Sequence, residues 1–187
     1  MNFNKHSEIP EGSHAFLSAS NYHWVNYSPE KLRERYATHR AAQRGTALHE
    51  FAKQAIRLGQ KLPRSPKTLN QYVNDGIGYR MTPEQPLFYS WNSFGTADTI
   101  SFRKQELRIH DLKTGVSRTS LIQLEVYAAL FCLEYGVDPK DITVELRIYQ
   151  DDDVVVGVPE TELLYSRMQK IIESDRIVNE MRMEEME

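Results

Sequence analysis

The stretch LRIHDLKTG (residues 107–115) combines a strand-like pattern with a charged end. Side chains in a strand alternate between the two faces of the sheet. Asp111 and Lys113 therefore share one face, whereas His110 and Leu112 share the other. An acid and a base on one face at a strand end indicate either an ion pair at a sheet edge or part of a metal-dependent hydrolytic site.

Strand-like segments lie on both sides of this stretch. Before it, PLFYSWN (86–92) and GTADTISFR (95–103) are rich in β-branched and aromatic residues, which predicts a three-stranded meander. After it, residues 117–135 predict a mostly apolar, buried helix. DITVELRIYQ (141–150) and VVVGV (154–158) predict two further strands.

Helix signals dominate the first third of the chain. Ser28 and Pro29 are typical of a helix start and predict a helix to about Ala42. Gly45 then separates it from a second helix, TALHEFAKQAIRL, which Gly59 closes.

The order of the expected elements predicts an α/β fold with a central mixed β-sheet flanked by helices. A shorter helix that begins at Pro66 and ends near Gly76 or Gly78 precedes the strands, and an amphipathic helix over 159–187 follows them. With 187 residues and 40% apolar residues, the chain is expected to form one domain over 1–187. Its residues 1–27 are expected to be irregular.

The composition excludes several classes of protein. The one cysteine, Cys132, excludes an internal disulfide and any four-cysteine metal or iron–sulfur site, and its apolar surroundings predict a buried side chain. No apolar run approaches the roughly 18 residues of a membrane span, and the start of the chain has no signal-peptide core. We therefore expect a soluble, cytoplasmic protein with no membrane partner.

The charge is unevenly distributed along the chain. The net charge is −3, yet residues 31–67 hold ten basic residues against Glu34 and Glu50. The segment 159–187 has eight acids against four bases. This asymmetry is compatible with a local surface for a polyanion and equally with solvated helix faces.

Four short patches contain the residues suited to chemistry: GTALHE (45–50), GTAD (95–98), DLK (111–113) and QLEVY (123–127). Asp98 precedes Asp111 by thirteen residues, and a meander can bring two such positions side by side. Two neighbouring carboxylates repel each other unless a cation lies between them. Hard oxygen ligands suit Mg²⁺ or Mn²⁺.

Further candidates follow from the same patches. His49 can supply a nitrogen ligand, which favours acceptance of Mn²⁺, and Glu50, about 100° round the helix, is an additional candidate. Lys113 can hold or deprotonate an attacking water. Gln123 and Tyr127 share a helix face.

In this order, H…GxxD…DxK…QxxxY resembles the RecB-type, phage-exonuclease-like branch of the PD-(D/E)XK nuclease superfamily. The resemblance spans about residues 18–149 and includes the opening LSASNYHW. It implies a restriction-endonuclease-like fold whose second and third strands carry the acids, and metal-dependent cleavage of DNA. Many relatives hold an iron–sulfur cluster with four cysteines. This chain has one cysteine, so no cluster is expected.

The resemblance also assigns roles to residues. The implied metal ligands are His49, Asp98, Asp111 and the main-chain carbonyl of Leu112. The implied catalytic residues are Asp98, Asp111, Lys113, Gln123 and Tyr127. The basic residues on either side of His49 are expected to contact DNA: Arg40, Arg44, Lys53 and Arg57.

The expected activity is that of an exonuclease on linear DNA, with Mg²⁺ or Mn²⁺ as cofactor. A catalytically silent RecB-like module that binds DNA or a partner, and a structure-specific endonuclease, remain alternatives. A homo-oligomeric ring and a recombination or helicase partner are also left open.

Some chemically suggestive residues have simpler interpretations. Asp151, Asp152 and Asp153 lie between two expected strands, where an acidic hairpin turn is the ordinary explanation. His110 faces away from Asp111, so we expect it to pack or to support the site. Three other histidines have no partner at the spacing of a metal ligand: His14, His23 and His39. Trp24 and Tyr27 are expected to pack on the core as part of the N-terminal segment.

Overall fold

The computed structural model describes residues 7–8, 10, 12–115 and 120–185. The chain divides into two compact units, 1–44 and 45–187. The division falls within helix α1 (Pro29–Leu58), which contributes residues to both units. The single domain expected from the sequence stays a prediction, because compactness does not test whether a unit folds alone.

The first unit contains a 3-10 helix, η1 (Ala19–Asn26), and the beginning of α1. The Trp24 indole donates a hydrogen bond to the carbonyl of Ser18 at 3.0 Å. The ring of Phe16 lies 5.2 Å from Tyr36 and 5.1 Å from His39, centroid to centroid. The segment expected to be irregular therefore contains a helical turn and packs on α1 within its own unit.

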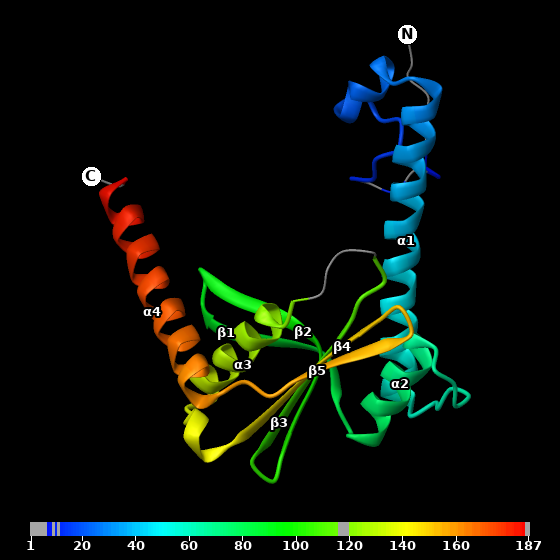
Figure 1. The fold of residues 1–187 in the computed structure, drawn as a ribbon. Helices are drawn as coiled ribbons and strands as arrows, with labels where there is room; N and C mark the ends of the chain where they lie inside the picture. The colour runs from blue at the N-terminus through cyan, green and yellow to red at the C-terminus, as the bar shows by residue number, and fades with distance from the viewer. Residues whose placement is uncertain (1–6, 9, 11, 116–119, 186–187) are drawn as a thin grey trace. The chain divides into compact units, whose positions relative to one another are not determined.

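The second unit is built on a five-stranded mixed sheet in the order β1-β2-β3-β4-β5 (Figure 1). The first three strands form the predicted antiparallel meander, β3 and β4 are parallel, and β4 and β5 are antiparallel. The strands are β1 (Thr82–Ser90), β2 (Ser93–Arg103), β3 (Glu106–Leu112), β4 (Thr143–Gln150) and β5 (Asp153–Gly157). The α/β fold with a mixed sheet flanked by helices is confirmed.

Helices cover both faces of this sheet. The crossover helix α3 (Ile122–Tyr135) joins the parallel strands β3 and β4, as parallel pairing requires. It packs with Leu107 and Ile109 in one core, and α2 (Thr68–Gly78) packs with Leu112 in another. Because Ile109 and Leu112 are three residues apart in β3, these two cores lie on opposite faces.

Helix α3 is buried, as its apolar sequence predicts, and Cys132 lies in its core-facing surface. Its expected start at Ser117 lies outside the described residues. The 3-10 turn η2 (Pro139–Asp141) leads from α3 into β4. Within the described residues, no helix combines the length and apolar character needed to cross a membrane.

The C-terminal helix α4 (Thr161–Glu184) packs against α3 through only part of its expected apolar face. Leu164 is buried and Met168 packs on the core. Ile172 and Val178 stay 44% and 38% exposed. The acidic residues before β5 form the expected hairpin turn, in which Asp152 pairs with Lys67 at 2.6 Å.

The predicted helix break at Gly45 is wrong, because α1 is one continuous helix. A Cβ atom at Gly45 would lie 2.6 Å from Oγ1 of Thr114. The glycine therefore permits a close approach between the helix and the segment after β3. A glycine at a close contact cannot be distinguished in the sequence from a glycine that ends a helix.

Candidate functional site

The site lies where β2 and β3 separate. Their antiparallel ladder runs from Arg103 and Glu106 to Thr99 and His110, and no pair is formed beyond Thr99 and His110 among the described residues. Asp98 and Asp111 occupy the next positions. The two acids thus stand at the end of the ladder, on the second and third strands.

The backbone of β3 holds the Asp98 carboxylate in this gap. The amide of Leu112 donates a hydrogen bond to Oδ2 of Asp98 at 3.0 Å. This contact places the main chain of Leu112 beside the carboxylate. Burial raises the pKa of Asp98 to about 6, and the charge of Asp111 contributes to the rise. The expected proximity of the two acids is therefore present in the structure.

A histidine and a second carboxylate complete a cluster around Asp98. The Nδ1 atom of His49, from α1, lies 3.4 Å from Oδ2 of Asp98. One ligand atom from each of His49, Glu84 and Asp98 lies within 4.8 Å of the other two. We call these three residues the acidic cluster. All three belong to the second unit.

Glu84 belongs to the acidic cluster although no sequence motif marks it. Its neighbours Pro83 and Gln85 pair with Thr99 and Ala97, so Glu84 lies opposite Asp98 on the adjacent strand. Its φ is +54°, a conformation that costs free energy for a residue with a side chain. In the sequence, only the distance of Glu84 from the β1–β2 turn indicates that it lies opposite Asp98. That distance is informative only when the pairing register of the hairpin is known.

A chain of hydrogen bonds leads from the second acid to α3. Asp111 is 4% exposed, and Nζ of Lys113 lies 3.1 Å from its Oδ1. The same ammonium group donates to Oε1 of Gln123 at 3.0 Å, and Nε2 of Gln123 donates to the Tyr127 hydroxyl at 3.4 Å. A Cβ at Gly95 would lie 2.9 Å from the Tyr127 ring. The predicted residues of DLK and QLEVY thus form one connected group.

Asp111 pairs with Lys113 rather than joining the acidic cluster in this structure. Its Oδ2 atom lies 3.0 Å from Nζ of Lys113. That oxygen is buried and accepts no hydrogen bond among the described residues. It remains a carboxylate oxygen that a cation beside Asp98 can use.

The additional candidate Glu50 points elsewhere. It pairs with Lys53 at 2.9 Å and accepts a hydrogen bond from Gln54 at 2.8 Å, and its side chain is 54% exposed. It is not one of the three residues of the acidic cluster.

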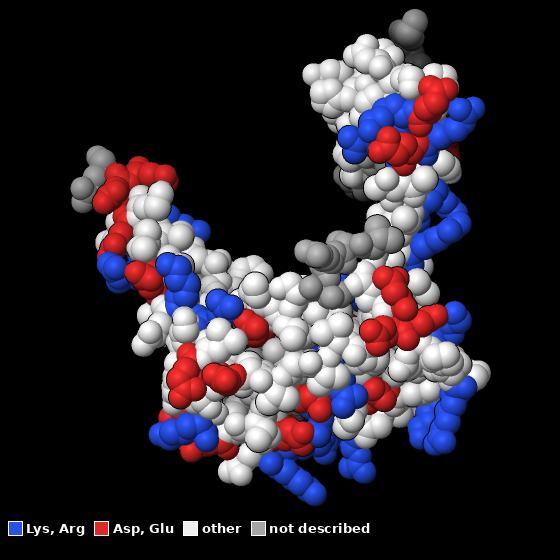
Figure 2. Space-filling view, in the orientation of Figure 1, with Lys and Arg blue, Asp and Glu red and all other residues white. Residues whose placement is uncertain are grey.

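The four basic residues expected to contact DNA are divided between the two units. Arg40 and Arg44 belong to the first unit, whereas Lys53 and Arg57 belong to the unit that contains the cluster. Lys and Arg side chains lie along α1, and charges of both signs are mixed on α4 (Figure 2). Their contact with DNA stays a prediction.

The donor set of the acidic cluster fits a hard divalent ion. One imidazole nitrogen and two carboxylate oxygens, completed by water, match the ligands that Mg²⁺ and Mn²⁺ take in proteins. Ligand atoms of one such ion lie at most about 4.4 Å apart, so only a small side-chain adjustment separates this cluster from a coordination shell.

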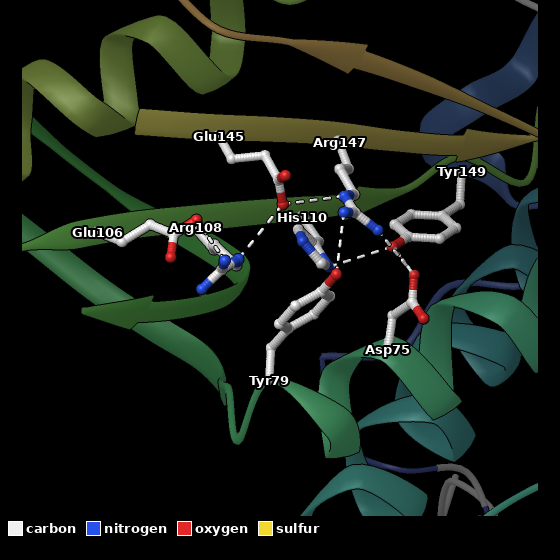
Figure 3. A network of polar contacts seen from close by, with 8 residues as sticks. All are labelled: Asp75, Tyr79, Glu106, Arg108, His110, Glu145, Arg147 and Tyr149. Carbon is white, nitrogen blue, oxygen red and sulfur yellow. Dashed lines mark hydrogen bonds and ion pairs between the residues drawn. The ribbon is translucent and has the colours of Figure 1, made fainter. Parts of the chain in front are cut away.

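A network of polar contacts supports β3 from the opposite face of the sheet (Figure 3). His110 is fully buried, and its Nδ1 lies 3.3 Å from the Tyr149 hydroxyl, which donates to Asp75 of α2 at 2.6 Å. Arg147 also contacts Asp75, at 3.0 Å. Burial lowers the pKa of His110 to about 3. His110 therefore packs, as expected, next to the position of Asp111.

The same network holds Tyr79 between two guanidinium groups. Arg108 and Arg147 lie 4.4 and 5.0 Å from the centre of its ring. Glu145 faces both arginines across β3 and β4, at 3.3 Å and 3.0 Å. These contacts fix the two parallel strands against α2.

A comparison of the chain with protein-family models, with curated proteins and with solved structures finds no match. The resemblance to PD-(D/E)XK nucleases therefore rests on the sequence motifs.

Proposed function

We propose that this chain is a divalent-metal-dependent nuclease of the PD-(D/E)XK type that acts as an exonuclease on linear DNA. One observation supports the proposal above all others. The acidic cluster of His49, Glu84 and Asp98 lies beside the Asp111–Lys113 pair, at the point where two strands separate.

The arrangement of elements supports the finer fold assignment. A helix precedes three antiparallel strands, and a crossover helix then leads to a strand parallel to the third. The acids occupy the second and third strands, as the resemblance implies. The fold alone does not determine an activity, so the site residues bear the functional argument.

The acidic cluster would hold the metal ion, with Asp111 and the Leu112 carbonyl available to it. A bound Mg²⁺ or Mn²⁺ supplies Lewis-acid stabilisation of the phosphate and a water of lowered pKa. Asp98 would orient the ion through one oxygen while the Leu112 amide fixes its carboxylate.

Lys113 would position the nucleophilic water or a phosphate oxygen. Its ammonium group has three N–H donors, and Asp111 and Gln123 take two of them. The third can donate to the reacting group, where its charge offsets the negative charge that develops on the phosphate. Gln123 and Tyr127 would hold Lys113 in this position.

The test is cleavage of end-labelled linear duplex, linear single strand and closed circular DNA, each with Mg²⁺, Mn²⁺ or EDTA. We expect metal-dependent loss of linear substrate that the variant Asp111→Asn abolishes. Asp152→Asn, in the exposed β4–β5 turn, is the matched control and should cut at the wild-type rate.

Two results would contradict the proposal. Equal cutting of closed circles would indicate the endonuclease alternative. Binding of DNA without cleavage of any substrate would indicate a catalytically silent module.

A further inference from the structure

Three exposed aromatic side chains gather at the turn between β1 and β2. Phe88 is 40%, Trp91 81% and Phe94 62% exposed. The ring of Phe88 lies 5.5 Å from that of Trp91 and 6.3 Å from that of Phe94, centroid to centroid. We call these three residues the aromatic patch. Exposed clusters of large apolar side chains commonly mark binding surfaces.

The aromatic patch and the acidic cluster lie on the same two strands, β1 and β2. Phe88 pairs with Phe94, and Glu84 lies opposite Asp98 four residues further along each strand. Four residues span about 13 Å, so a short stretch of extended nucleic acid can reach from one group to the other.

The other face of this hairpin is occupied. Leu87 and Ala97 are fully buried in the core that α3 completes. Phe88 and Phe94 are the neighbours of buried or core-facing residues in their strands, so their rings are left in solvent.

Helix α4 fixes the turn that presents Trp91. Asp175 accepts hydrogen bonds from the Ser90 hydroxyl at 2.5 Å and from the Asn92 amide at 2.8 Å. The Asn92 amide also donates to Asn179 at 2.8 Å. The residues on both sides of Trp91 are thus held, while its indole stays in solvent. An anchored turn reduces the entropy lost when a ligand stacks on that ring.

We propose that the aromatic patch is a stacking platform for unpaired bases of a single-stranded nucleic acid whose phosphodiester lies at the acidic cluster. This inference rests on the proposed nuclease function and extends it to the class of substrate. The residues from Thr82 to Phe102 include no Lys or Arg, so the hairpin itself offers aromatic rings rather than cations to a ligand. Single strands offer free base faces to aromatic side chains, whereas the bases of a duplex are already stacked.

The direct test uses the fluorescence of Trp91. The chain has two tryptophans, Trp24 and Trp91, so in the variant Trp24→Phe Trp91 is the sole tryptophan. We would titrate this variant in EDTA with a 20-nucleotide oligothymidine and with a duplex of equal length. We expect saturable quenching by the single strand and little by the duplex. Unchanged emission would overturn the platform.

Substitutions test the same contact through affinity. Trp91→Ala and Phe94→Ala are each expected to weaken binding of the oligothymidine about tenfold or more, since stacking contributes about 1–3 kcal/mol per base. Tyr135→Ala removes an aromatic side chain of similar exposure, 54%, at the C-terminal end of α3 and should leave the affinity unchanged. Equal affinities for all four chains would contradict the proposal.

The two proposals fail separately. Quenching of Trp91 without cleavage of any DNA would refute the nuclease activity and leave the platform. Metal-dependent cleavage without quenching would leave the nuclease and refute the platform.

Discussion

Asp98 has a raised pKa because it is half-buried beside a second acid. Its pKa in the folded chain, about 6, exceeds the ordinary value of 3.8, so the folded state binds a proton more tightly than the unfolded state. The contribution of Asp98 to the free energy of unfolding then falls as pH rises from 3.8 to 6. A shift of this size corresponds to about 3 kcal/mol.

The variant Asp98→Asn should therefore be more stable than the wild type in metal-free buffer above pH 6, by up to about 3 kcal/mol. The amide oxygen can still accept the Leu112 hydrogen bond. Urea unfolding at pH 8 and at pH 4 measures the difference, which should shrink at the lower pH. An Asp98→Asn variant less stable than the wild type at pH 8 would contradict this assignment.

Metal affinity should follow the same titration. Because a ligand carboxylate must be ionised, the affinity for Mn²⁺ should fall about tenfold for each pH unit below about 6. Calorimetry in buffers of different ionisation enthalpy should detect proton release near pH 6. The Asp98→Asn variant should bind weakly and without this pH step; an unchanged pH profile would exclude Asp98 as a ligand.

At the residue level, the sequence indicates which types of side chain the candidate site contains better than it indicates which individual residues come together there. Asp98, Asp111 and Lys113 are recognisable because each belongs to a short motif on one strand or directly at its end. Glu84 lies in no motif, and its place in the cluster depends on the register of β1 against β2. Glu50 is next to His49 in sequence, but its side chain turns to Lys53 and Gln54.

At the element level, the path of α1 past the segment after β3 depends on Gly45. Although alanine favours a helix by about 1 kcal/mol over glycine, Gly45→Ala should destabilise the chain because its Cβ would meet Thr114 at 2.6 Å. We expect a net loss of up to about 2 kcal/mol, since overpacking costs about 1–3 kcal/mol and the gain in helix propensity offsets about 1 kcal/mol. Thermal unfolding measures it.

Gly78, at the end of α2, is the matched control, because outside its own helical turn no atom of the described residues lies within 4 Å of the Cβ position there. Gly78→Ala should be neutral or stabilising. Adding Thr114→Ala to Gly45→Ala should restore part of the loss. An additive double variant would exclude the contact as the cause.

The elements show why local signals sometimes fail. The meander, α3 and the acidic turn follow from patterns within ten to twenty residues, and the structure contains them. The break at Gly45 does not follow, because a glycine that ends a helix and a glycine that admits a neighbour look alike. The contact that distinguishes them comes from Thr114, 69 residues later.

At the scale of the whole molecule, the charge asymmetry predicts how DNA binding responds to salt. Basic residues that contact phosphates release counterions, so each contact adds about −0.7 to −0.9 to the slope of log affinity against log salt. Replacing Lys53 and Arg57 with Gln should make this slope less negative by about one to two for linear DNA. Lys140→Gln, an exposed lysine paired with Asp138, is the control.

The same experiment on Arg40 and Arg44 tests the first unit. If α1 binds DNA along its length, their replacement should also make the slope of log affinity against log salt less negative. An unchanged slope in both double variants would indicate that the basic residues of this segment are solvated rather than bound to DNA.

The division of the chain at Gly45 could not be predicted from the sequence, since no linker or change of composition marks it.

The two candidate glutamates provide the most direct test of the metal-dependent nuclease. Cleavage of end-labelled linear DNA in Mn²⁺ would be compared for the wild type, Glu84→Gln and Glu50→Gln. We predict that the wild type and Glu50→Gln cut at similar rates. The cleavage rate of Glu84→Gln should be at least about a hundredfold lower, which is the effect of removing one group that stabilises a transition state. A wild type that cuts no DNA in Mn²⁺, or a Glu84→Gln variant that cuts as fast as the wild type, would contradict the account.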